Sequence, residues 1–239
     1  MKPVLLLIPG MFNTPAIWQY VVQELQAEAD IRILDVTTQD TLQSMAGDAW
    51  DLVQDIPTGV PLMVCGYSMG GYVALELLAT HANRIHAIAM VDSSASVETA
   101  DSLVVREKTI YALEKNFDKA VEGVIAFSLH TESQKNPELV VAMRSMMHTV
   151  GAATAIRQTR ALMVRRDHTA LLQKWHKPAL IVCGREDKIT PPQLSTELSQ
   201  LMPHARLAWI DNAGHQTPFE QPAQVAGHLR FLMRSLVAT

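Results

Sequence analysis

Short apolar runs alternate with longer amphipathic stretches along much of the chain. Six runs are short, mostly apolar and bounded by Gly, Pro or polar residues, which is the pattern of buried strands. They cover residues 4–8, 31–34, 62–65, 87–91, 179–183 and 206–210. The stretches between them carry apolar residues at helical spacing, for example Trp18, Val21, Val22 and Leu25. This alternation predicts an α/β fold with a mostly parallel, doubly wound sheet of about six strands.

The alternation stops between about residues 95 and 175, where helical patterns follow one another without a strand. Asn136 and Pro137 predict the N-cap and the first residue of a helix, and Gly151 predicts its end. We therefore expect a core domain made of residues 1–94 and 176–239. A helical lid would be inserted into it over residues 95–175.

The composition is typical of a globular protein and argues against nucleic-acid and membrane partners. Of 239 residues 48% are hydrophobic, so a large core can form. The 20 Lys and Arg against 24 Asp and Glu leave a net charge of −4. Nucleic-acid binding is not expected, because no basic excess can neutralise phosphates. The apolar run 4–8 is too short for a signal peptide, and no run approaches the ~20 residues of a membrane span. We expect a cytoplasmic protein without a membrane partner.

Two cysteines, Cys65 and Cys183, lie inside apolar runs. Two thiols cannot form a disulfide framework, and their spacing matches no zinc pattern. The sequence therefore predicts two buried free thiols and no metal site.

A nucleophile motif follows the strand predicted at 62–65. The residues Gly66-Tyr67-Ser68-Met69-Gly70 are G-x-S-x-G in a strand–turn–helix setting. Glycines on both sides of the serine allow strand and helix to approach closely. The helix N-terminus favours negative charge at this point. The motif predicts Ser68 as a nucleophile.

A serine hydroxyl needs a base, and the base needs an acid that orients it. Among nine histidines, His215 stands in the loop after the last predicted strand and is the candidate base. Asp187 and Asp92 each follow a strand, at the edge where catalytic groups gather in parallel sheets. Asp187 is the preferred acid, and Asp92 is the alternative or a turn cap. The neighbouring Glu186 is expected to be solvated.

The order Ser68, Asp187, His215 resembles that of the α/β-hydrolase superfamily, over essentially the whole chain. The resemblance is to small, lidded esterase- and lactonase-like serine hydrolases. It implies an oxyanion hole formed by the backbone N–H groups of Met69 and Met11. It implies neither a metal nor an organic cofactor.

The chain departs from the family pattern in three places. Pro9-Gly10 stands where the family often has His-Gly, so backbone donation survives but side-chain bonds that brace the loop are lost. The family's first two antiparallel strands would precede Val4. The connector over residues 36–44 lacks the usual Gly-rich turn.

The resemblance implies hydrolysis of a small or medium, mostly apolar carboxylic ester through an acyl-enzyme. The alternatives are enol-lactone, thioester or carbon–carbon bond cleavage by the same residues, or a non-catalytic small-molecule binder. Lid residues form either an adaptable apolar wall or ordinary packing. They are Met143, Met146, Met147, Met163, Phe117 and Phe127. The sequence does not indicate an oligomeric state.

Overall fold

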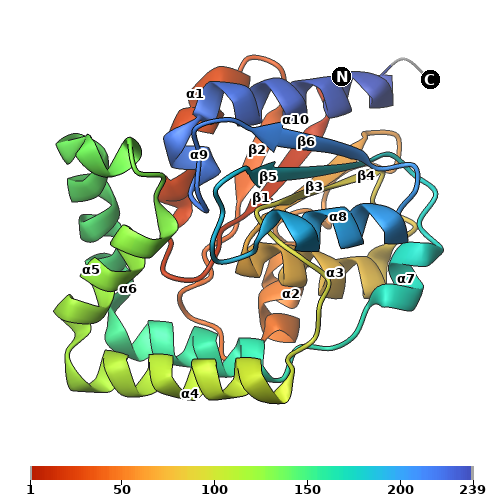
Figure 1. Ribbon diagram of the computed structural model, residues 1–239. Helices are drawn as coiled ribbons and strands as arrows, with labels where there is room; N and C mark the ends of the chain where they lie inside the picture. The colour runs from red at the N-terminus through yellow and green to blue at the C-terminus, as the bar shows by residue number, and fades with distance from the viewer. Residues whose placement is uncertain (1, 238–239) are drawn as a thin grey trace.

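The computed structural model describes residues 2–237 and contains one six-stranded sheet (Figure 1). All neighbouring strands are parallel, in the order β2-β1-β3-β4-β5-β6. The strands are β1 (Val4–Ile8), β2 (Asp30–Ile33), β3 (Leu62–Tyr67), β4 (Ala87–Val91), β5 (Ala179–Gly184) and β6 (Arg206–Ile210). The predicted doubly wound sheet is confirmed, and each strand lies within a few residues of its apolar run.

Helices cover both faces of the sheet because alternate strand residues point to opposite sides. Leu5 and Leu7 of β1 pack toward α1 (Gln19–Leu25) and α10 (Pro222–Val237). Leu6 and Ile8 pack into the opposite cluster. That cluster includes α2 (Leu42–Asp51), α3 (Met69–His81) and α8 (Pro192–Leu201). The layers are visible in Figure 1, with α1 and α10 above the sheet and α2, α3 and α8 below it.

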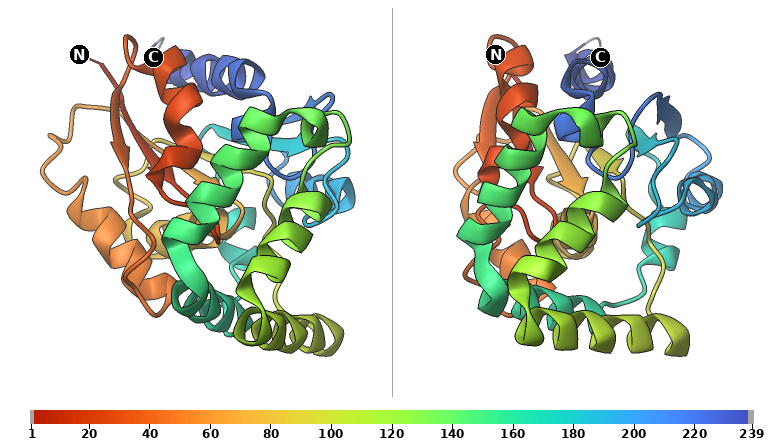
Figure 2. Two further views of the ribbon diagram at one scale, coloured as in Figure 1. Left: turned by 90° about the vertical axis from the view of Figure 1, so that its left-hand side faces the viewer. Right: turned by 60° about the vertical axis from the view of Figure 1, so that its left-hand side comes forward.

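Three helices of the region predicted as a lid pack on one another beside the sheet. They are α4 (Ala100–Lys115), α5 (Phe117–Ser128) and α6 (Pro137–Met163). Both views of Figure 2 bring these green helices in front of the core. The short helix α7 (Thr169–Gln173) instead contacts α8, and Leu172 and Trp175 share a core cluster with Leu198. The domain boundaries at 95 and 175 stay a prediction.

Gly151 breaks α6 into two rods. Its φ of 74° and ψ of 163° are not helical, at the residue where the sequence predicts a helix end. Within residues 2–237, α6 is the one helix whose length and composition would allow it to cross a membrane. Since the kink divides it, neither half reaches the ~20 residues that a span requires.

Two 3₁₀ turns and one short helix are the remaining elements of residues 2–237. They are η1 (Pro15–Trp18), η2 (Ser133–Lys135) and α9 (Thr217–Glu220).

Candidate active site

Ser68 stands in a strained turn between β3 and α3. Its φ of 51° and ψ of −117° lie outside the regions that residues with a side chain prefer. Its N–H donates to the Val91 carbonyl oxygen at 2.9 Å, which ties the turn to β4. A side chain at Gly66 would collide with the Gly70 carbonyl, and one at Gly70 with the Ile8 carbonyl. Both glycines of the motif are thus required by close backbone approach.

The structure brings Ser68, His215 and Asp187 together in one hydrogen-bonded chain. His215 Nε2 lies 2.8 Å from Ser68 Oγ, and His215 Nδ1 lies 2.8 Å from Asp187 Oδ2. Both His215 and Asp187 are buried, each 3% exposed. The imidazole therefore connects a partly buried hydroxyl with a carboxylate shielded from water.

Asp187 is held by the loop that it begins. Its Oδ1 accepts hydrogen bonds from the N–H groups of Ile189 and Thr190, at 2.8 and 2.9 Å. Its Oδ2 accepts one from the Thr190 hydroxyl at 2.8 Å, in addition to the imidazole. The carboxylate can therefore turn little, and it presents Oδ2 to His215.

Asp92, the alternative acid, is not part of this hydrogen-bonded chain. It is fully buried, and no hydrogen bond joins it to His215 within the described residues. Oδ1 accepts from the Gly184 N–H at 2.9 Å, and Oδ2 accepts from the Thr217 hydroxyl at 2.5 Å. Asp92 therefore ties the end of β5 to α9. Glu186, as expected, is exposed.

The buried charges shift the pKa of the imidazole. Burial alone lowers the pKa of His215, but the attraction and hydrogen bond of Asp187, with Asp92 and Glu220 further away, outweigh burial and raise it. Burial, and then repulsion by Asp187, hold the pKa of Asp92 well above its ordinary value. The surroundings of His215 thus stabilise the imidazolium that forms when the ring accepts a proton.

Glu220 has a role that the sequence did not predict. Its Oε1 accepts from the N–H groups of Gly214 and Gln216, at 2.9 and 3.1 Å. Its Oε2 accepts from the His130 N–H at 2.8 Å. Glu220 therefore fixes the backbone on both sides of His215. The available signal was an acidic residue five positions after the candidate base.

The predicted oxyanion-hole residues lie on either side of the nucleophile. Met69 is the first residue of α3, and Met11 lies in the turn after β1. A Cβ placed on Gly10 would lie 3.0 Å from Ser68 Cβ, so this loop passes directly against the nucleophile. Within residues 2–237 neither the Met11 nor the Met69 N–H donates to a protein acceptor.

The ligating atoms of Asp92, Cys183 and Asp187 lie within 4.8 Å of one another, as in a small metal site. Protein donors already occupy both carboxylates, as described above. Burial, and then repulsion by Asp92, raise the pKa of the Cys183 thiol, so it stays protonated. Each of the three groups is therefore engaged by a different hydrogen-bond partner within the protein. Both cysteines are buried and free, as predicted.

Three of the four methionines of α6 lie in one core cluster. Met143, Met146 and Met147 are buried in the core cluster that also contains Ile125. Phe127 is 55% exposed and lies outside that cluster. Two arginines of α6 are paired with carboxylates of the protein: Arg144 with Glu122 and Arg157 with Asp40.

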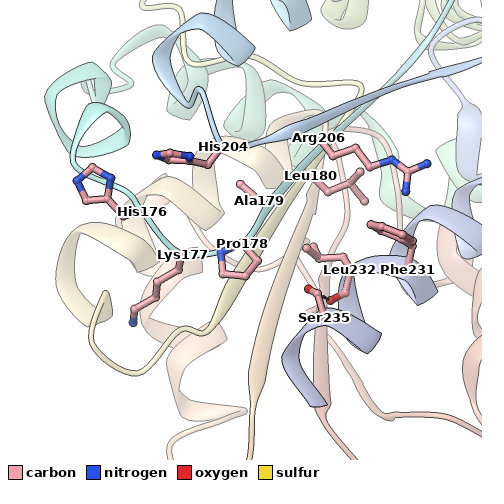
Figure 3. A pocket seen from close by; sticks show the side chains of 10 residues that line it. All are labelled: His176, Lys177, Pro178, Ala179, Leu180, His204, Arg206, Phe231, Leu232 and Ser235. Carbon is pink, nitrogen blue, oxygen red and sulfur yellow. Dashed lines mark hydrogen bonds between the residues drawn. The ribbon is translucent and has the colours of Figure 1, made fainter. Parts of the chain in front are cut away.

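A surface hollow of about 360 Å³ lies at the opposite end of the sheet, where β5 and β6 begin (Figure 3). His176 and His204 stand side by side on one side of it, and Arg206 lies over the Phe231 ring on the other. This hollow is separate from the loops around Ser68.

Known proteins match this chain along most of its length. A family model described as serine aminopeptidase, S33 matches residues 33–222. A pimeloyl-[acyl-carrier protein] methyl ester esterase of Neisseria meningitidis serogroup C is 26% identical over 69% of this chain. That alignment spans 66% of the relative, slightly less than two thirds. A protein of the same name from Nitrosomonas europaea is 23% identical over 93% of this chain and 92% of its own length.

Solved structures share the fold. A thermophilic esterase from Thermogutta terrifontis has a TM-score of 0.87 and 23% identity, covering 99% of this chain and 90% of that one. An enol-lactonase from Burkholderia xenovorans LB400 has a TM-score of 0.85 and 19% identity, covering 98% of this chain and 92% of that one. The chain therefore belongs to the serine aminopeptidase S33 family and has the α/β-hydrolase fold that its sequence motifs predict.

Proposed function

We propose that this chain is a serine hydrolase that cleaves a carboxylic ester through an acyl-enzyme. The single observation that carries the proposal is the hydrogen-bonded chain from Ser68 through His215 to Asp187, with 2.8 Å at each imidazole nitrogen. The names of the relatives, methyl ester esterases, support the same bond type.

In the proposed mechanism, His215 takes the Ser68 proton while the serine oxygen attacks the ester carbonyl carbon. Asp187 holds the imidazole orientation and stabilises the imidazolium. The Met11 and Met69 N–H groups donate to the oxyanion. His215 then protonates the leaving alcohol, and a water molecule, activated by the same imidazole, releases the acid. Acid–base catalysis contributes about 10²–10⁴-fold, and one oxyanion donor about 10²–10³-fold.

The proposed substrate is an ester of a small or medium, mostly apolar acyl group. The names of the relatives support a small ester, and the methionines at Met69 and in the loop of Met11 support an apolar acyl group, because methionine adapts to irregular apolar shapes. We further propose a cytoplasmic location, without a nucleic-acid or membrane partner. No cofactor takes part in these steps.

The decisive experiment compares the wild-type chain with Ser68→Ala on p-nitrophenyl butyrate. The wild type should turn the ester over, and Ser68→Ala should lose at least about 10³-fold of kcat while keeping its circular dichroism spectrum. A fluorophosphonate probe should label the wild type only. Equal activity in the two proteins, or no labelling of the wild type, contradicts the proposal.

A substrate panel then identifies the bond. It contains a methyl ester of a seven-carbon dicarboxylic acid, the same ester on an acyl carrier protein, an enol-lactone, an acyl thioester and an aminoacyl p-nitroanilide. The highest kcat/KM is expected for the methyl ester that is not attached to an acyl carrier protein. A preference for the anilide would instead support the aminopeptidase activity in the family's description.

A further inference from the structure

A side chain of the inserted helix α6 holds the loop that carries Met11. Gln158 is fully buried, and its amide bridges two loops of the core. Its Oε1 accepts a hydrogen bond from the Phe12 N–H at 3.1 Å, and its Nε2 donates to the Val36 carbonyl oxygen at 2.9 Å. The oxygen and the nitrogen of the buried amide thus each have a hydrogen-bond partner. Gln158 is 146 residues from Phe12 and 122 residues from Val36 in the sequence.

The loop needs such support for two reasons. Phe12 has a φ of 64°, a left-handed conformation that is unfavourable for a bulky side chain. The backbone of this segment does not hold the conformation by regular secondary structure.

The peptide group between Met11 and Phe12 is fixed at both ends. Its carbonyl oxygen accepts a hydrogen bond from Asn13 Nδ2 at 2.7 Å, and its N–H is the one that donates to Gln158. The peptide before it is also held, because the Gly10 carbonyl accepts from the Asn13 N–H at 3.3 Å. These bonds leave the Met11 N–H unoccupied and fix its direction.

We infer that Gln158 is a positioning residue for the oxyanion hole, through which the insertion orients the Met11 N–H. This inference rests on the proposed function. Gln158 binds two loops of the core at once: the loop after Pro9 and the connector 36–44. Arg157 strengthens the second contact, donating to the Thr37 carbonyl oxygen at 2.6 Å. One side chain of α6 thus holds both loops in place.

The test replaces Gln158 by methionine, which keeps the length of the side chain and removes both hydrogen bonds. We expect kcat on p-nitrophenyl butyrate to fall about 10- to 100-fold, less than the about 10²–10³-fold of a lost donor. KM should change little, because only the transition state uses the oxyanion hole. An alkyl boronic acid, which forms a tetrahedral adduct with serine, should bind more weakly by a similar factor.

Leu162→Ala is the matched control, since Leu162 is buried one turn further along α6 and touches neither loop through a hydrogen bond. It should lower Tm and leave kcat and boronate affinity near wild type. If Gln158→Met does not fold, Gln158→Asn keeps the amide but cannot span both partners, and should show the same pattern more weakly.

Unchanged kcat and boronate affinity in a folded Gln158 variant overturn the inference, as does a rise in KM alone. A loss of kcat that Leu162→Ala reproduces at equal loss of Tm also overturns it. Failure of the proposed function is distinguishable, because the wild type itself would then lack Ser68-dependent esterase activity, and the inference would fall with it.

Discussion

The carboxylate of Asp92 accepts a 2.5 Å hydrogen bond from the hydroxyl of Thr217, 125 residues further along the chain. Thr217 begins α9, two residues after His215, so this bond places the base loop relative to β4. Asp92 therefore supports the candidate triad indirectly, through the backbone that follows His215, while Asp187 contacts the imidazole directly.

Substitution of the two buried acids should separate their roles. Asp187→Asn should lower kcat by about 10⁴-fold, because an amide no longer fixes the imidazole tautomer or stabilises its charge. Asp92→Asn keeps an acceptor oxygen and should lose far less. Steady-state kinetics on p-nitrophenyl butyrate measure both. Equal losses would mean that Asp92 supplies the acid.

The pH dependence follows from the raised pKa of His215. The base must be neutral, so kcat/KM should rise with pH, with a midpoint above the ordinary value of 6.5. The stability effect has the opposite sign. Because the pKa of His215 is higher in the folded protein than in the unfolded chain, protonation of His215 stabilises the fold. This stabilisation is complete at pH values below the unfolded pKa, and it disappears as pH rises through the folded pKa. The Tm difference between wild type and His215→Gln should therefore shrink as pH rises from the unfolded to the folded pKa of His215. A midpoint below 6.5 contradicts the prediction.

Removal of Glu220 should loosen the loop that carries His215. Glu220→Ala leaves the N–H groups of Gly214, Gln216 and His130 without their acceptor, and should cost about 1–3 kcal/mol or more in the free energy of unfolding. Glu220→Gln keeps Oε1 and two of the bonds, so it should retain most of the stability and activity. Urea unfolding and kcat measure the two effects. A fully stable Glu220→Ala variant would show that water replaces the carboxylate without cost.

Two glycines offer a matched pair of backbone tests. Gly70→Ala should prevent folding, because the new methyl group meets the Ile8 carbonyl. Gly47 lies exposed in α2 with nothing within 4 Å of an added methyl group, so Gly47→Ala should stabilise the fold by about 0.5–1 kcal/mol. Thermal unfolding distinguishes the two results. A soluble, native-like Gly70→Ala variant contradicts the close approach.

The strands and the nucleophile turn could be predicted because their signals are local. A buried parallel strand is a continuous apolar run, and the elbow at Ser68 needs its glycines within two residues. The choice between Asp187 and Asp92 was open in the sequence, since both follow strands that end at one edge of the sheet. Only the position of the His215 ring separates them.

The roles of Gln158 and Glu220 could not be predicted for a different reason. Each side chain binds backbone groups, and backbone groups are the same at every residue, so the partner leaves no trace in the sequence. Gln158 also occurs within a helical pattern, where a buried amide cannot be told from a solvated one. The left-handed Phe12 is likewise invisible, because glycine or asparagine is the usual signal for that conformation.

The kink at Gly151 allows the two halves of one helix to make different contacts. The rod before it carries the methionines 143, 146 and 147, and the rod after it carries Gln158. Because the backbone is not helical at Gly151, the second rod need not continue the direction of the first. The first rod can therefore bury its methionines beside Val121 and Ile125 of α5, while the second keeps Gln158 on two loops of the core. Gly151→Ala, which disfavours the positive φ of the kink, should weaken one of these two sets of contacts.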